Sequence, residues 1–387
     1  MAYFLISFLL LFLCARTNTD QNADESVELN YNVDTYPPYP VKPKTINYFL
    51  VNNVYAKNID AVFKSLKSQT CLIFEKKKNY SKNIHIHFFY DYSGDVISLA
   101  CCKNTETKAF LTNKTQHSLR LTSHYIGRAL GLTPEILRED RDKFVKMDFK
   151  NIDSNYKKYY ENPNITIRLK PTTDFNYKSI MFLSPYYGSK NQQPIFKAKM
   201  SSYYDEMIGK YDYFTHNDKK YLNSIYCSSK CKNKFSGCKN GGYENPSCNA
   251  CICPTGFVGK KCTSIASSKG KCGSKKYFTV STKKKYITGD SFSGTCYFSI
   301  KSTSTKKYVK IIVENLSIAS TSKCNGEYGL EIKHRDDKGA DGLYLCGQYR
   351  KVEIPVTSNF VLLRYNVTGK NNKLKISYQQ VNSLSKI

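Results

Sequence analysis

The feature that most constrains the fold is a cysteine-dense stretch in the middle of the chain, CSSKCKNKFSGCKNGGYENPSCNACICPTGFVGKKC, which runs from Cys227 to Cys262. A segment so short and so rich in glycine cannot bury a core of its own and has to be held by disulfides. The residue composition and hydrophobic pattern change on both sides of this stretch, so the chain divides into several units. The length of 387 residues is also that of two or three domains.

The cysteines and the first residues indicate an extracellular protein. Residues 2–13, AYFLISFLLLFL, are an apolar run of signal-peptide length, and we place the signal peptide at 1–17. Its removal takes away Cys14 and leaves 15 − 1 = 14 cysteines, an even number as disulfides require. No later apolar run is long enough for a membrane span, so we expect a secreted protein. Sequons predict glycosylation at Asn79, Asn113, Asn164, Asn315 and Asn366.

The segment before the cysteine-dense stretch has a mixed α/β pattern. A polar, then Pro- and Tyr-rich extension at 18–42 precedes it. The apolar spacing in NIDAVFKSLKSQ predicts a helix, and the β-branched and aromatic residues of NIHIHFFYDY predict a strand. The sequence TSHYIGRALG predicts another helix, with Thr122 or Ser123 as its cap and Gly131 at its end.

The segment after the cysteine-dense stretch reads as all-β. Residues 265–271, IASSKGK, have the composition of a linker. From Cys272 onward, alternating segments such as KYVKIIVENLSI, YGLEIKHR and NFVLLRYNVT predict a β-sandwich.

The formal charge of 59 − 31 = +28 favours polyanionic partners, such as glycosaminoglycans, anionic membranes or nucleic acid. A general bias of the whole chain toward Lys, Asn and Tyr is the more frequent origin of such a charge. No long basic amphipathic helix is present, and we expect no nucleic-acid partner.

One predicted helix has the residue spacing of a zinc-peptidase helix but lacks most of the metal-binding and catalytic residues. Such a helix needs two histidines at i and i+4, a glutamate beside the first, and a third histidine after a glycine turn. In SHYIGRALGLTPEILREDRDKF only the first histidine, His124, is present. His85 and His87, two apart on a predicted strand, offer another chelating pair, although a buried strand position is the more frequent explanation.

This stretch resembles the astacin family of zinc metallopeptidases. The retained family positions are His124, Gly131, Glu135, Arg138, Asp140, Arg141 and Asp142, and FNYKSIMFLSP resembles the family's Met-turn with Ser179 and Met181. The cysteine-dense unit resembles an EGF-like module and the last segment a CUB domain. The resemblance implies an α+β, metzincin-like astacin domain at 43–227, an EGF-like module at 228–264, the linker, and a CUB-like domain at 272–387.

The departures from the family pattern affect the catalytic and metal-binding positions. Tyr125 stands at the position of the general base, Arg128 at the second ligand position and Pro134 at the third, and Phe182 and Leu183 follow the Met-turn methionine. Arginine keeps its proton and puts a cation where the metal would lie, and a phenol is too weak a base. We therefore predict an inactive pseudoenzyme with no cofactor. The alternative is an active zinc endopeptidase with an atypical site, which would need Zn²⁺.

The family pattern also implies disulfides. The implied pairs are Cys71–Cys227, Cys231–Cys248, Cys238–Cys251, Cys253–Cys262, Cys272–Cys296 and Cys324–Cys346, with Cys231 as another possible partner of Cys71. Cys101 and Cys102 are left over, as a strained vicinal disulfide or two free thiols. The sequence leaves open whether the CUB-like domain binds calcium.

The function expected from the sequence is binding. The ligands would be proteins or peptides, or anionic glycans of the extracellular matrix, and a cleft containing Arg128 would take an acidic or carbonyl group in place of zinc. A further reading makes the EGF-like and CUB-like half the binding part, with the first domain as a spacer.

Overall fold

The computed structural model describes residues 45–100, 106–160, 172–232, 235–319 and 326–385. The predicted extension at 18–42, Asn164, Cys101, Cys102 and Cys324 lie outside these residues. No helix in the described ranges is long and apolar enough to cross a membrane.

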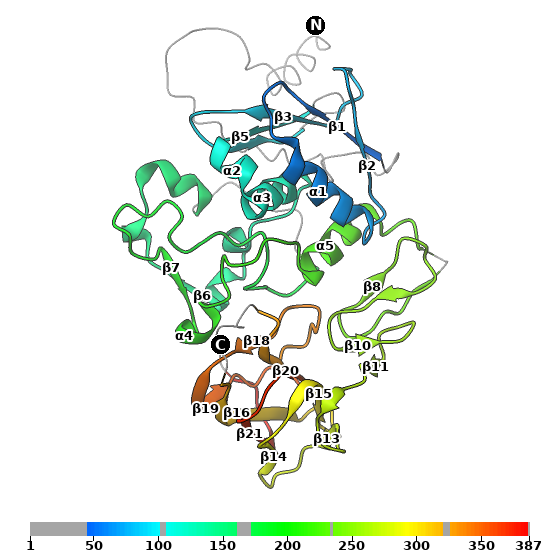
Figure 1. Ribbon diagram of the computed structural model, residues 1–387, viewed down its shortest axis with the longest axis vertical. Helices are drawn as coiled ribbons and strands as arrows, with labels where there is room; N and C mark the ends of the chain where they lie inside the picture. Colours follow the sequence, from blue (N-terminus) through cyan, green and yellow to red (C-terminus); the bar gives the residue numbers. More distant parts are fainter. Residues whose placement is uncertain (1–44, 101–105, 161–171, 233–234, 320–325, 386–387) are drawn as a thin grey trace, which may run out of the picture.

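The N-terminal part is a five-stranded sheet with helices on one face (Figure 1). The strand order is β2-β1-β3-β5-β4, with β4 antiparallel to β5 and the other neighbours parallel. The strands are β1 (Thr45–Leu50), β2 (Ile73–Lys76), β3 (Ile86–Tyr90), β4 (Val96–Ser98) and β5 (Thr107–Leu111). The helices are α1 (Ala56–Lys67), α2 (Asn113–His117) and α3 (Leu119–Ala129).

The predicted helix NIDAVFKSLKSQ and strand NIHIHFFYDY are present as α1 and β3. The apolar stripe of α1, Ile59, Val62, Phe63 and Leu66, is buried against the sheet and α3. Together with α5 (His216–Tyr226), these elements enclose a single core.

The lower part of this unit has little regular structure. It contains the strand pair β6 (Val145–Met147) and β7 (Phe196–Ala198), the helix α4 (Ser201–Tyr204), and four 3-10 turns. The turns are η1 (Glu135–Leu137), η2 (Arg141–Lys143), η3 (Phe149–Asn151) and η4 (Ser154–Tyr159). Aromatic side chains make up much of its core, and Phe175, Phe182 and Phe196 are all buried there.

The cysteine-dense unit consists of two small hairpins. They pair β8 (Tyr243–Glu244) with β9 (Cys251–Ile252) and β10 (Phe257–Val258) with β11 (Ser264–Ile265). Its small core, Phe257 and Cys262, packs against Leu362 of the last segment.

The last segment is a sandwich of two sheets, as its alternating pattern predicts. One sheet has the order β12-β15-β20-β17-β18, with β13 beside β15, and the other has the order β14-β21-β16-β19. The strands are β12 (Lys269–Lys271), β13 (Tyr277–Thr279), β14 (Lys285–Gly289), β15 (Ser293–Lys301), β16 (Tyr308–Ser317), β17 (Gly329–Lys333), β18 (Leu343–Leu345), β19 (Gln348–Ile354), β20 (Phe360–Val367) and β21 (Lys373–Val381). Part of the predicted linker is thus an edge strand, β12, whose Lys-Gly-Lys sequence has no alternating pattern.

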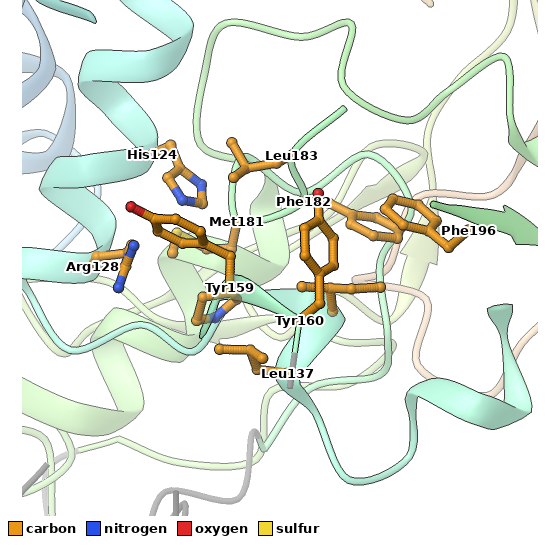
Figure 2. A pocket seen from close by; sticks show the side chains of 11 residues that line it. His124, Arg128, Leu137, Tyr159, Tyr160, Met181, Phe182, Leu183 and Phe196 are labelled. Carbon is orange, nitrogen blue, oxygen red and sulfur yellow. The ribbon is translucent and has the colours of Figure 1, made fainter. Parts of the chain in front are cut away.

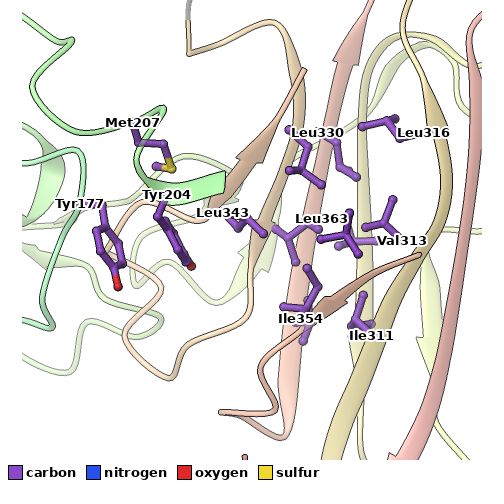
Figure 3. Close-up of a cluster of buried hydrophobic side chains, with 14 of the residues drawn as sticks. Tyr177, Tyr204, Met207, Ile311, Val313, Leu316, Leu330, Leu343, Ile354 and Leu363 are labelled. Atoms are coloured by element: carbon purple, nitrogen blue, oxygen red, sulfur yellow. The ribbon is translucent and has the colours of Figure 1, made fainter. Parts of the chain in front are cut away.

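The sandwich and the lower part of the first unit share one hydrophobic core (Figure 3). Tyr177, Tyr204 and Met207 lie on the side of Leu343 and belong to the same buried cluster as the inner side chains of both sheets. Polar contacts cross the same boundary: the Tyr204 hydroxyl lies 2.8 Å from His334 Nε2, and Asn176 Nδ2 donates to Asp341 Oδ2 at 2.9 Å.

Candidate functional site

The helix α3 places His124 and Arg128 on one face. It starts earlier than the sequence predicts, because Ser118 rather than Thr122 or Ser123 is the cap: Ser118 Oγ accepts from Leu121 N at 3.2 Å. It ends before Gly131, whose φ of 84° needs the left-handed region. His124 and Arg128 are one turn apart, so both point into the same pocket (Figure 2).

The Met-turn packs against α3. Ser179 Oγ donates to Asp218, which also completes a capping box with Thr215 at the start of α5. Met181 N in turn donates to Ser179 Oγ at 3.0 Å. The sulfur of Met181 lies so close to α3 that a Cβ added at Gly127 would be 2.5 Å from it. The retained Ser179 and Met181 therefore hold the turn against the helix.

His124 is a buried, neutral histidine. Its Nδ1 lies 3.0 Å from the carbonyl oxygen of Ile180, and because a carbonyl only accepts, Nδ1 carries the proton. Burial, reinforced by the charge of Arg128, lowers the pKa of His124 to about 3. The imidazole thus has a structural hydrogen bond and stays uncharged at any physiological pH.

Arg128 is a buried cation with no counterion among the described residues. The whole residue is 3% exposed, and its Nε is buried without a hydrogen-bond partner. The guanidinium carbon lies 5.8 Å from the ring centres of both Tyr125 and Tyr159, within the range of cation–π contacts.

The hydroxyl of Tyr125 is directed toward another phenol. It lies 3.1 Å from the hydroxyl of Tyr187, and the side chain is fully buried. Burial raises the pKa of the Tyr125 phenol well above its ordinary value, with smaller contributions from Tyr187 and Asp95. The group at the base position is therefore a neutral hydrogen-bonding phenol.

The pocket beside Arg128 is narrow and mostly apolar. The free space in it is about 20 Å³, room for about one water molecule. No acidic side chain lines it. The lining residues are His124, Arg128, Pro134, Ile136, Leu137, Tyr159, Tyr160, Met181, Phe182, Leu183 and Phe196. Tyr159 and Tyr160 come from η4 and its end, and nothing in the run YKKYY of the sequence indicates that they approach α3.

The donor set does not fit zinc. His124 is one nitrogen ligand, Arg128 cannot release its proton, and Pro134 has no donor side chain. Across the described part of the chain, no three His, Cys, Asp or Glu side chains lie close enough together to hold one metal ion. His85 and His87 do not form a pair: His85 Nδ1 accepts from Asn47 N at 3.0 Å, and His87 Nδ1 faces Glu106 at 2.9 Å.

The other retained residues brace the lower part of the unit. Arg138 donates to both oxygens of Asp140, at 2.8 and 2.9 Å, and to the carbonyl of Thr173. Arg141 donates to the carbonyls of Ile136 and Tyr160. Asp142, in contrast, is largely exposed, and its Oδ1 lies 3.3 Å from Arg141 Nε.

Glu135 is buried beside Arg138, with 3.6 Å between Oε2 and Nε. Burial raises its pKa to about 8, against the opposing charge of Arg138.

Five of the implied disulfides are present in the structure. They are Cys71–Cys227, Cys231–Cys248, Cys238–Cys251, Cys253–Cys262 and Cys272–Cys296. Cys71 pairs with Cys227 and not with Cys231, and the pair with Cys324 lies outside the described residues.

The predicted glycosylation sites differ in their surroundings. Asn79 and Asn113 are exposed, and Asn315 is half-buried on β16. Asn366 Nδ2, the atom that would carry a glycan, donates to the carbonyl of Glu327 at 2.8 Å.

The unit thus has a helix with a histidine at a zinc-ligand position, a methionine turn packed against that helix, and a mixed sheet on its other side. This arrangement is that of a zinc-peptidase-like scaffold. Residues 40–227 match the model of the peptidase family described as Astacin, and the chain belongs to the astacin family.

The chain is similar to zinc metalloproteinases of nematodes. It is 30% identical over 269 residues to nas-34 of Caenorhabditis elegans, an alignment covering 68% of this chain and 43% of that protein. It is 25% identical over 351 residues to nas-36 of Brugia malayi, covering 87% and 58%. The chain thus spans about half the length of the curated relatives it matches. A solved structure, the hatching enzyme zinc-protease HCE-1 of Oryzias latipes, is 18% identical over 47% of this chain and 88% of that one, with a TM-score of 0.41.

Proposed function

We propose that this protein is a secreted, catalytically inactive astacin that binds proteins or peptides through its former active-site cleft. The EGF-like and CUB-like character of the two C-terminal units is part of the same proposal. Secretion is supported by the five disulfides and by the apolar run at 2–13. The observation that carries the proposal is Arg128, a buried cation one turn after His124.

The catalytic step of a zinc peptidase needs a metal-bound water and a group that takes its proton. Arg128 repels a metal ion from the only histidine of the helix. The hydroxyl of Tyr125 is directed to Tyr187 and has a raised pKa, so it cannot take the proton at neutral pH. Ligand, base and water position are thus lost together.

The experiment measures zinc and proteolysis on the full chain, secreted from a eukaryotic host in zinc-containing medium. We expect well under one zinc per chain by elemental mass spectrometry, and no chelator-sensitive cleavage of casein or of a fluorogenic peptide library. An active astacin from the same host is the positive control. One tightly held zinc per chain, with cleavage that a chelator abolishes, would establish the active endopeptidase instead.

A second candidate function is the binding of anionic glycans by the sandwich. Between residues 268 and 310 the chain has eleven lysines and one acidic residue, Asp290. Lys301 lies beside β13, since Thr279 of β13 pairs with it. Three exposed lysines stand nearby in the sequence, Lys283 and Lys284 in the β13–β14 connection and Lys285 at the start of β14. Such a concentration of one charge on a β-surface suits a sulfated polysaccharide. Retention on immobilised heparin, compared between the wild-type chain and a variant with all three lysines changed to serine, tests it.

A further inference from the structure

Six arginine or lysine side chains in the described part of the molecule are buried: Arg128, Arg138, Lys178, Lys333, Arg335 and Lys338. Five of them donate to carboxylate, hydroxyl or carbonyl oxygens. Arg138 binds Asp140, Lys178 the carbonyl of Gly326, and Lys333 the carbonyls of Lys338 and Ala340. Arg335 binds the carbonyls of Phe175 and Asp341, and Lys338 the carbonyl of Arg335 and the hydroxyl of Ser358.

Arg128 is the exception in this set. It makes no hydrogen bond and no ion pair with the described residues, and its Nε is fully buried. The two tyrosine rings at 5.8 Å interact with the charge but accept no hydrogen bond in the guanidinium plane. A cation removed from water without an acceptor is unfavourable unless a ligand supplies one.

No anionic side chain competes for Arg128 in the lining of the pocket that it faces. His124 is neutral, with its proton on Nδ1 donated to Ile180. The other walls, such as Leu137, Leu183 and Phe196, are apolar. The pocket therefore presents one planar cation beside the neutral polar groups of His124, Tyr159 and Tyr160, at the end of a mostly apolar cleft.

We infer that this pocket is an anion site in which Arg128 binds the carboxylate of a peptide whose neighbouring side chain is apolar. The inference rests on the proposed function, because it needs the cleft to be free of zinc. The guanidinium edge matches a planar carboxylate through two parallel N–H···O bonds. The free space of about 20 Å³, room for about one water molecule, is of the size of one edge of a planar carboxylate. The apolar walls favour an organic anion over a hydrated inorganic one.

The carboxylate has two possible sources, a peptide C-terminus or an acidic side chain, and the probes separate them. N-acetyl-leucine has an apolar side chain and a free carboxylate, N-acetyl-leucinamide lacks the charge, and N-acetyl-glutamyl-leucinamide has only a side-chain carboxylate. Calorimetry on the full chain measures each of them. We expect N-acetyl-leucine or the glutamyl probe to bind in about the millimolar range or tighter, and the neutral amide to bind about tenfold or more weakly.

The variants Arg128→Gln and Arg128→Lys test the residue. We expect glutamine to abolish the preference for the acid, and lysine to keep part of it because the charge remains but the paired N–H groups do not. Arg350→Gln, which removes an exposed cation from β19, should bind like the wild-type chain. Melting temperatures establish that each variant is folded.

Two results would overturn the anion site: acid and amide binding equally well, or Arg128→Gln keeping the full preference for the acid. Failure of every carboxylate to bind would also overturn it. None of these results alters the zinc and cleavage measurements, so failure of the anion site and failure of the proposed function are distinguishable.

Discussion

Replacing Arg128 by methionine should stabilise the protein, which is unusual for a buried residue. Methionine has a similar length and removes both the charge and the orphaned Nε. An unsatisfied buried donor costs about 1–3 kcal/mol. The lost contacts with Tyr125 and Tyr159 lie near the outer limit of cation–π distances and contribute about 0.5 kcal/mol each. The net effect, about 1–3 kcal/mol recovered less about 1 kcal/mol lost, is a gain of about 0–2 kcal/mol in the free energy of unfolding.

The matched control is Arg138→Met. Arg138 is also buried, but it donates to both oxygens of Asp140 and to the carbonyl of Thr173. Its loss removes charge-assisted bonds and leaves their acceptors unpaired, at a cost of about 2–4 kcal/mol. The two variants should therefore shift stability in opposite directions, although both exchange a buried arginine for methionine.

The assay is calorimetric or fluorimetric melting of the full chain at neutral pH and fixed scan rate, without added carboxylates. For a domain of about 200 residues, 1 kcal/mol shifts the midpoint by about 2–4 °C. We expect Arg128→Met to melt above the wild-type chain and Arg138→Met below it. If Arg128→Met melts as far below the wild-type chain as Arg138→Met does, Arg128 has a partner in solution and the reasoning on the anion site is wrong.

The remaining predictions concern His334, Gly127 and the lysine-rich surface. Burial, with smaller contributions from Arg335 and Lys338, lowers the pKa of His334 to about 3, so between about pH 3 and 6.5 only the unfolded chain binds this proton. The folded chain therefore loses stability as the pH falls below 6.5. His334→Gln should reduce the slope of unfolding free energy against pH in this range by about 1.4 kcal/mol per pH unit, measured by melts at several pH values. An unchanged slope would contradict this prediction. Gly127→Ala should destabilise by about 1–3 kcal/mol in the same melts because its Cβ meets the sulfur of Met181, and equal stability would show that Met181 moves freely aside. Changing Lys283, Lys284 and Lys285 to serine should lower the salt concentration of elution from heparin, whereas Arg350→Gln should change it little; equal losses would indicate net charge rather than a defined surface.

The local pattern of the sequence predicted the elements around the site well. The stripe of α1 and the β-branched run of β3 are short-range signals, and both elements are present. The cap of α3 was wrong by one turn, because Ser118, Thr122 and Ser123 are all good cap residues and only the packing of α2 against α3 selects the first.

Sequence patterns could not predict which side chains contact the site residues. Tyr125 meets Tyr187, which is 62 positions later in a segment without regular structure. Tyr159 approaches Arg128 through a 3-10 turn that has no periodic pattern. The spacing within α3 therefore placed His124 and Arg128 on one face, but it could not show that Arg128 lacks an acceptor. That property depends on every element around the pocket.

The shared core bears on the reading in which the first domain is only a spacer. A spacer would contact the sandwich through a small polar surface, as mobile domains do. Here the core is continuous from Tyr177 and Tyr204 to Leu343 (Figure 3), and polar contacts join Asn176 to Asp341 and Tyr204 to His334. The sandwich therefore supports the underside of the segment that carries the Met-turn, and removing either half would expose this core. Binding assigned to one half is better tested in the full chain, with Arg128 variants for the cleft and lysine variants for the sandwich, than with separated halves.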